Sequence, residues 1–226
     1  MRLATIIITI LCSSIVFSQE SKLYFELEIS KHIKAFNSFS ERAVSNNDTN
    51  AALVLFDSLV KTHLKDTYVS EMVLKKVNGG KFSTSKIKNP FLLITKSEWE
   101  QISQKEIEAI NMMSKLYKGQ IDFVILFWTS KAIAKKRSSG FNSLITVTFV
   151  DERQNNADHI VKSYKHSFGA PSCFFISENK QLINIDRKFT ENFNLVNIEE
   201  AFKSTHEEIK SIISRKQAFN VDLPKE

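Results

Sequence analysis

Residues 91–128 read FLLITKSEWEQISQKEIEAINMMSKLYKGQIDFVILFW. The segment opens with the continuous apolar run 91–94 and closes with the run 121–128, a pattern typical of central strands buried on both faces. Between these runs, apolar residues recur at helical spacing, which predicts one long helix over 97–117. The apolar face of that helix is expected to hold Trp99, Ile102, Ile107, Ile110, Met113 and Leu116. A buried strand, a helix and a second buried strand indicate a layered α/β sheet.

Secondary-structure signals continue on both sides of this segment. Upstream, Asn78-Gly79 lies between two apolar alternations and predicts a β-hairpin over 73–83, because Asn-Gly favours the tight turns that join antiparallel strands. Downstream, the pattern predicts a short basic helix over 131–141, a strand over 144–150, a helix over 157–168, a closing hairpin of 173–176 and 182–185, and a last helix from Asn197. The closing hairpin makes the expected sheet mixed.

The first 18 residues have the features of a secretory signal peptide. Arg2 supplies the positive start, residues 3–16 form an apolar run too short to span a bilayer comfortably, and Ser18 is a small residue at the cleavage position. We therefore expect cleavage after Ser18 and export to the periplasm or the cell exterior. An uncleaved N-terminal anchor is the alternative. No later stretch approaches ~18 consecutive apolar residues, so no membrane span is expected after cleavage.

Residues 19–66 are predicted to form a helical segment ahead of the main domain, which covers 67–226. Two amphipathic helices are expected, over 20–45 and 51–64, with a break at 46–48. Their apolar stripes are too small to form a core alone, so the helices should dock on the main domain. The residues expected at this contact are Leu23, Leu27, Phe36, Leu55 and Leu59.

Composition excludes several classes of protein. A chain of 226 residues with 42% hydrophobic and 25% charged residues is a folded globule rather than a disordered chain. The net charge of +6 is modest and spread along the chain, which argues against a nucleic-acid partner. The histidines lack metal-ligand spacing and there is no glycine-rich phosphate loop, so no metal and no cofactor is expected. Of the 2 cysteines, signal cleavage would remove Cys12 and leave the single thiol of Cys173.

The order of elements, with Pro171 just before the closing hairpin, resembles the thioredoxin fold in its exported redoxin form, the TlpA-type thiol–disulfide oxidoreductases. The resemblance covers about residues 67–190. It rests on Val73 to Ser83 as the leading hairpin, Phe91 to Trp99 as the strand before the family's W-C-x-x-C, Lys105 to Asn111 as its K-E-I-P-A-L-N, Asp122 to Trp128 as the next strand, and Phe168 to Ile176 as its G-x-P-T-x-F-x-I. The resemblance implies a three-layer α/β fold with a mixed central sheet, an N-terminal β-hairpin extension and a cis peptide bond at Pro171.

The sequence departs from this family at the redox site. Aligning Trp99 and Glu106 with the family pattern puts Glu100 at the first cysteine and Ser103 at the second. Disulfide exchange needs a thiolate, which neither a carboxylate nor a hydroxyl can replace. We interpret Ser97-x-x-Glu100 as a capping box at the helix start, where the helix dipole would lower the pKa of the carboxyl. The alternative is a general base at Glu100 with Ser103 as nucleophile, which would require a raised pKa.

The remaining candidate residues lie around the closing hairpin. Cys173 follows Pro171 by two residues inside an apolar run, where a thiol is typically a core residue. In the family, the proline loop pairs with an extended peptide of the partner, so the resemblance implies a binding surface around Trp99, Ala170 and Pro171. The sequence thus favours an exported binding or scaffolding module without dithiol redox activity, whose partner is a protein or peptide of the cell envelope. The alternative is a redoxin-type oxidoreductase or peroxidase that works through Cys173 or a partner protein.

Overall fold

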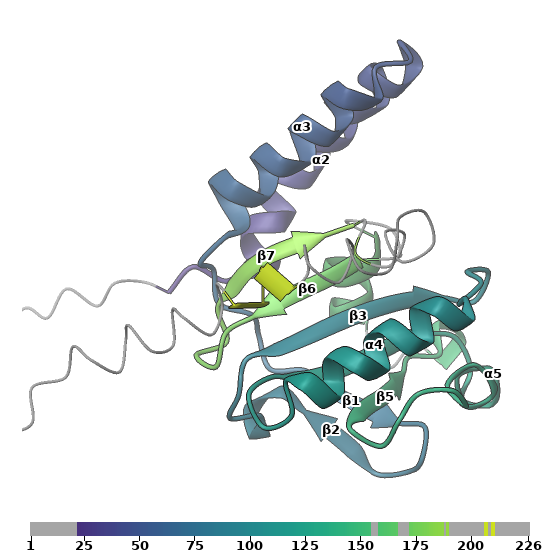
Figure 1. The fold of residues 1–226 in the computed structure, drawn as a ribbon. Helices are drawn as coiled ribbons and strands as arrows, with labels where there is room; N and C mark the ends of the chain where they lie inside the picture. The colour runs from purple at the N-terminus through teal and green to yellow at the C-terminus, as the bar shows by residue number, and fades with distance from the viewer. Residues whose placement is uncertain are drawn as a thin grey trace, which may run out of the picture.

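A computed structural model of the chain describes residues 22–154, 158–166, 172–187, 189, 206–207 and 209–210. Figure 1 shows a twisted sheet flanked by helices, with a pair of long helices projecting away from it. The predicted signal peptide, Ala170, Pro171 and most of the predicted C-terminal helix lie outside the described residues. Within the described part of the chain, no helix is long and apolar enough to cross a bilayer.

Among the described residues, one mixed sheet has the strand order β2-β1-β5-β4-β3-β6-β7. β3 pairs in parallel with β4, and β4 with β5, whereas all other neighbours are antiparallel. The strands are β1 (Val73–Lys76), β2 (Lys81–Ser83), β3 (Phe91–Ser97), β4 (Asp122–Trp128), β5 (Ile145–Phe149), β6 (Ser172–Ile176) and β7 (Leu182–Asp186). The predicted mixed sheet and leading hairpin are confirmed. In the turn of that hairpin, Gly79 and Gly80 have φ of +95° and +78°, which glycine adopts without steric cost.

The central strands carry continuous apolar runs because both faces of the sheet are covered. Along β3, Phe91 and Leu93 belong to one hydrophobic cluster, and Leu92 and Ile94 belong to another. β4 and β6 divide their residues between the same two clusters. Successive residues of a strand point to opposite faces, so a strand covered on both sides needs an apolar residue at nearly every position.

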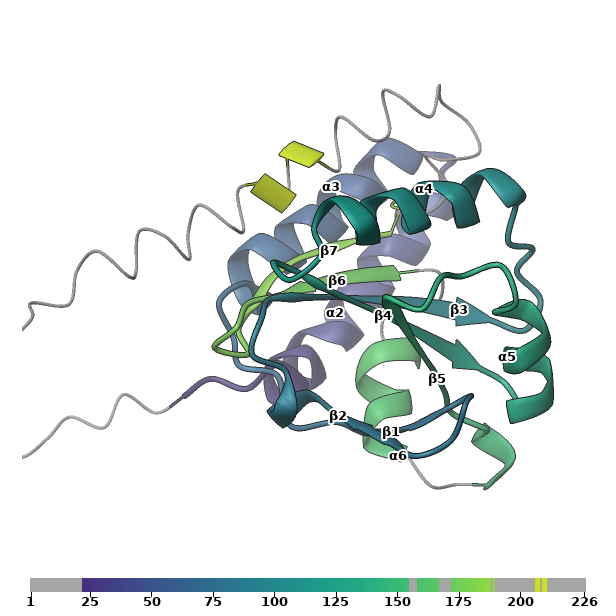
Figure 2. The same ribbon diagram turned by 60° about the horizontal axis from the view of Figure 1, so that its bottom comes forward.

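Helices form the two outer layers. On one face, α4 (Gln104–Leu116) and α5 (Lys131–Arg137) contribute to the cluster that contains Leu92. On the other face, α2 (Phe25–Ser45) and α6 (Asp158–Ile160), with the π-helix that follows it, contribute to the cluster that contains Phe91. Figure 2 shows α4 and α6 on opposite sides of the sheet. The three layers confirm the predicted α/β fold class.

The N-terminal helices contact the sheet through one end of the pair, and their other ends extend beyond it (Figure 1). α2 packs against α3 (Thr49–Leu59), which continues as the π-helix Val60–Leu64. Leu59 is buried in the same cluster as β3, as the sequence predicted. A polar contact fixes the start of α2, because the carboxylate of Glu26 accepts bonds from the N–H and the hydroxyl of Ser70 at 3.1 and 2.9 Å.

Phe36 also packs against this cluster, as expected, but two of the expected contact residues do not. Leu23 and Leu27 are largely exposed, and Phe25 is fully buried in their place. α2 begins at Phe25 directly after Tyr24, which forms a β-bridge with Tyr68. That bridge sets the rotation of the helix about its axis, so it decides which side faces the sheet. Helical spacing reveals an apolar stripe but does not specify this rotation.

Phe25 gives a direct test of this docking. Its ring lies 5.1 Å from that of Tyr164 and 6.1 Å from that of Phe174, between centroids. We expect Phe25→Ala to lower the free energy of unfolding by about 3–5 kcal/mol, because it leaves a cavity in the core. The matched control is Leu27→Ala, at a side chain that is 59% exposed, with a loss below about 0.5 kcal/mol. Urea denaturation followed by circular dichroism measures both, and equal small losses would show that α2 does not share the core.

Candidate functional site

Polar side chains gather where β3 and β4 end, at one edge of the sheet. Ser97 and Trp128 are the last residues of these parallel strands and are register partners. In open α/β sheets, ligands bind outside the carboxyl ends of the strands. At this edge, the hydroxyls of Ser97 and Ser172 and the indole N–H of Trp128 are buried with no hydrogen-bond partner among the described residues. This edge is therefore the candidate functional site.

Three charged side chains cluster beside the end of β3, of which Lys96 and Glu106 are buried and Glu100 is partly buried. Lys96 Nζ lies 2.7 Å from Oε1 of Glu106 and 3.6 Å from Oε2 of Glu100. Lys96 points to the same face as Leu92 and Ile94, which is the face covered by α4, and Glu106 lies in the first turn of that helix. The side chains of Lys96 and Glu106 are almost inaccessible to water. A charge so deeply buried has to be paired, and here one ammonium group serves two carboxyl groups.

Burial raises the pKa of both carboxyl groups. For Glu100, loss of hydration is the largest effect, and the nearby Lys96 and the hydrogen bond from Ser97 oppose it. For Glu106, loss of hydration again dominates over Lys96, and the negative charge of Glu100 raises the pKa further. The expectation of a lowered pKa at Glu100 is therefore wrong.

The reason is that the helix begins later than predicted. β3 continues through Ser97, and α4 starts at Gln104, so Glu100 is not at a helix N-terminus. Ser103 is the N-cap, and its hydroxyl accepts the N–H of Glu106 at 3.1 Å. The expectation that residues from 97 to 103 are helical is thus wrong. Of the expected capping box, the bond from the N–H of Ser97 to the carboxylate of Glu100 forms, but no helix follows it.

The turn that follows β3 is held from three directions. Within it, Oε1 of Glu100 accepts the N–H of Ser97 at 3.0 Å. From α5, the guanidinium of Arg137 donates to the carbonyl oxygens of Ser97 and Glu100 at 3.2 and 2.5 Å. After β4, the hydroxyl of Thr129 donates to Oε2 of Glu98 at 2.8 Å. These bonds restrict the conformations of residues 97–100.

Trp99 lies at the tip of this turn and is 71% exposed. It does not belong to the apolar face of α4, where the sequence placed it. Lys165 Nζ lies 5.4 Å from the centroid of the Trp99 ring and 5.9 Å from that of Trp128, and it also forms a 2.5 Å ion pair with Glu152. The exposed indole is therefore flanked by a cation that is already fixed in place.

The remaining predicted site residues divide into two groups. Cys173 is fully buried in β6, opposite Ile94, which confirms its prediction as a core residue. Ala170 and Pro171 lie outside the described residues, so the binding surface predicted around them remains a prediction. In the described part of the chain, no group of three or more His, Cys, Asp or Glu side chains could hold a metal ion.

Several residues at this edge were not found from the sequence. Lys96 stands inside the run FLLITKS, which consists otherwise of apolar and small hydroxyl residues, and a lysine at the end of a buried strand is a signal that a partner must exist. Arg137 lies on the predicted short basic helix, and that pattern did not indicate that its guanidinium bonds the turn after β3. Lys165 gave no signal, because its contact with Trp99 joins residues far apart in the sequence.

No family model matches this sequence, and no curated protein is similar to it. Solved structures are similar in fold. A candidate protein disulfide isomerase from Bacteroides thetaiotaomicron superposes with a TM-score of 0.52 at 12% identity, covering 69% of this chain and 94% of that one. A hypothetical protein from Sinorhizobium meliloti 1021 gives a TM-score of 0.52 at 12% identity, with coverage of 68% and 86%. The C-terminal domain of a candidate thiol–disulfide oxidoreductase from Bacteroides thetaiotaomicron gives 0.48 at 17%, with coverage of 69% and 99%.

The chain has a thioredoxin-like fold. This confirms the fold that the sequence resemblance implied. The first of these structures is described as a protein disulfide isomerase, and at 12% identity the likeness concerns the fold. The chemistry of this thioredoxin-like chain has to be argued from its own side chains.

The buried charge cluster makes a prediction about stability and pH. Lys96→Met leaves two buried carboxyl groups without their ammonium partner, so we expect a loss of about 3–5 kcal/mol in the free energy of unfolding near neutral pH. The pKa values of Glu100 and Glu106 are raised in the folded state, so their contribution to stability is present at acid pH and is lost as pH rises through those values. Removal of Lys96 raises both pKa values further, so the loss should shrink as pH falls toward the ordinary glutamate range.

The control for this experiment is Lys105→Met, at an exposed lysine of the same helix, which should leave stability nearly unchanged at every pH. Guanidinium denaturation of the three proteins between acid and neutral pH gives the comparison. If the free energy of unfolding lost in Lys96→Met is the same at every pH, the result would contradict the charge cluster of Lys96, Glu100 and Glu106.

Proposed function

We propose that this protein is an exported thioredoxin-like module without dithiol redox activity, which binds a protein or peptide partner in the cell envelope through the surface around Trp99. The observation that carries the proposal is the 71% exposed indole on a turn held by Arg137, Thr129 and Glu100. Export and the cell-envelope partner rest on the signal-like residues 1–18 and on the family resemblance.

The occupants of the aligned redox positions support the absence of dithiol chemistry. Glu100 is bonded to the N–H of Ser97 and lies in the charge cluster with Lys96. Ser103 is the N-cap of α4. Neither group can form a mixed disulfide, and both have structural roles in this fold. The buried position of Cys173 argues against the alternative of a redoxin that works through this thiol, because an attacking thiolate has to reach its substrate.

The raised pKa of Glu100 removes one objection to a general base at this position, but a nucleophile is still needed. The hydroxyl of Ser103 accepts the bond that caps α4, and its oxygen is committed to the helix start. The arrangement therefore favours binding over hydrolysis.

The binding role is supported by the physical character of Trp99. Tryptophan is enriched at the centres of protein interfaces, because its large rigid ring buries much apolar area at little cost in conformational entropy. A turn that is already fixed loses little further freedom on binding. Trp99 shares its edge of the sheet with the ends of β3 and β4, where extended ligands of α/β folds commonly lie.

The redox part of the proposal has a direct assay. In the presence of dithiothreitol, the protein should not precipitate insulin faster than buffer alone, because no accessible thiol pair is present. A Cys12→Ser variant leaves Cys173 as the only thiol, and this thiol should react with Ellman's reagent only after guanidinium is added. Rapid reaction of native Cys173 would contradict its burial, and insulin reduction above background would show that the module is a redoxin.

The binding part is tested at the indole. Peptides are selected from a phage-displayed random library on the wild-type protein, and their affinities are measured for Trp99→Ala by fluorescence anisotropy. We expect at least about tenfold weaker binding, the loss typical of a central interface tryptophan. Leu116→Ala removes an exposed apolar side chain of α4 and should leave affinity unchanged. If both variants bind the selected peptides as well as the wild type does, Trp99 is not the binding surface.

A further inference from the structure

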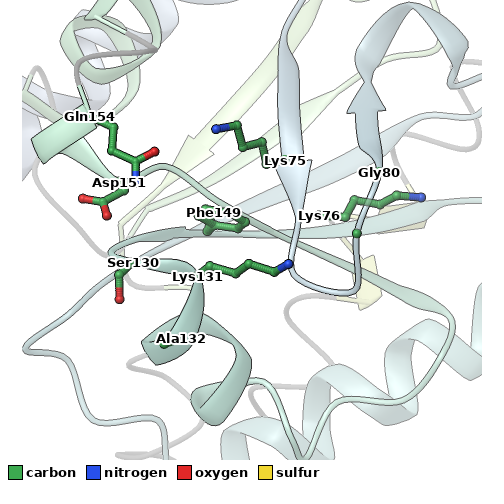
Figure 3. A pocket seen from close by; sticks show the side chains of 10 residues that line it. Lys75, Lys76, Gly80, Ser130, Lys131, Ala132, Phe149, Asp151 and Gln154 are labelled. Atoms are coloured by element: carbon green, nitrogen blue, oxygen red, sulfur yellow. The ribbon is translucent and has the colours of Figure 1, made fainter.

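A groove of about 490 Å³ lies at the edge of the sheet between β1, β5 and α5 (Figure 3). Lys75 and Lys76 of β1 line one side, and Ser130 and Lys131 at the start of α5 line the other. In Figure 3 the side chain of Lys75 extends toward Gln154, whereas that of Lys76 extends the opposite way, past Gly80. Phe149, the last residue of β5, lies between these two sides in Figure 3. The volume is within the range of ligand-binding clefts in proteins.

The groove occupies the same edge of the sheet as Trp99. β3, β4 and β5 are parallel neighbours, so their carboxyl ends face the same direction. Trp99 follows the end of β3, and Ser130 follows the end of β4. The two loops are joined by the 2.8 Å hydrogen bond from Thr129 to Glu98. The turn that carries Trp99 and the loop that carries Ser130 are therefore neighbours at the carboxyl ends of the parallel strands.

The groove carries uncompensated positive charge. Lys75, Lys76 and Lys131 form no ion pair with any described residue. Asp151, the carboxylate among the described lining residues, is already bound by Arg153, whose Nε lies 3.0 Å from its Oδ1. The three ammonium groups thus have no partner of their own, and such a site attracts anions.

We propose that this groove binds the acidic part of the partner peptide, with carboxylates of the peptide opposite Lys75, Lys76 and Lys131. This inference rests on the proposed function, because the same peptide would contact Trp99. The side chains of Lys75 and Lys76 extend in opposite directions in Figure 3, so several carboxylates spaced along a chain suit these lysines better than one compact anion does. Lysine is a flexible point charge, so it accepts such a peptide without demanding one fixed geometry.

The probes are two fluorescein-labelled peptides, one of alternating leucine and glutamate and the other with glutamine in place of every glutamate. Fluorescence anisotropy measures binding to the full chain at low salt. We expect the wild type to bind the acidic peptide about tenfold more tightly than the glutamine peptide, because several exposed ion pairs act together. This preference should decrease as salt is added, because salt screens exposed charges. Equal affinity for the two peptides would overturn the inference.

The deciding variant is Lys75→Gln with Lys76→Gln and Lys131→Gln, which should abolish the preference. The matched control is Lys34→Gln with Lys61→Gln and Lys118→Gln, which removes the same charge from exposed lysines elsewhere and should retain the preference. If the control variant loses the preference for the acidic peptide equally, or if the groove variant keeps this preference, the groove is not the acidic-peptide site. A short oligothymidylate that binds the groove more tightly than the acidic peptide would also overturn the proposal, in favour of a nucleic-acid ligand.

Trp99→Ala separates this inference from the proposed function. If Trp99→Ala weakens both peptides while the groove variant keeps the preference for glutamate, the groove inference fails and the Trp99 surface stands. If Trp99→Ala leaves both peptides unaffected while the groove variant loses the preference, the groove is an anion site and the proposed Trp99 surface fails.

Discussion

The burial of β3 on both faces is the constraint on which the rest of this molecule depends. All seven of its residues are inaccessible, from Phe91 to Ser97. A strand buried on both faces has to be covered by a layer on each side, and α4 supplies one layer while α2 and the α6 segment supply the other. The N-terminal helices are therefore part of the core at their sheet-proximal ends, through Phe25 and its contact with Phe174.

This burial continues to the last residues of the strand, where the sequence is no longer apolar. Lys96 lies under α4, and Glu106 in the first turn of that helix meets its ammonium group. The ion pair links the end of β3 to the start of α4, and Ser103 caps the helix one turn before Glu106. The chain between them is a turn and irregular backbone, because β3 pairs with β4 through Ser97 and α4 begins only at Gln104. A turn is the result, and Trp99 lies on its exposed side.

The same edge collects the features that point to binding. Parallel strands end there together, so loops from different parts of the sequence lie next to one another. Arg137 and Thr129 come from the elements after β4 and hold the turn that carries Trp99. Lys131 precedes Arg137 on the same short helix and faces the groove (Figure 3). One helix thus contributes both to the rigidity of the aromatic surface and to the charge beside it.

The sequence by itself determined the order of the elements, the mixed sheet and the buried character of the strands at 91–94 and 121–128. These features follow from local signals: continuous apolar runs, the turn preference of Asn78-Gly79 and helical spacing. The sequence holds only two cysteines, Cys12 and Cys173, and apolar neighbours placed the thiol of Cys173 in the core. Tertiary structure decided where α4 begins, which side of α2 faces the sheet, the direction of the pKa shift of Glu100, and the exposure of Trp99. Each of these depends on contacts between residues that are separated in sequence, such as Lys96 with Glu106 or Tyr24 with Tyr68. Local periodicity carries no information about which separated groups come into contact, or about how much hydration those groups lose on folding.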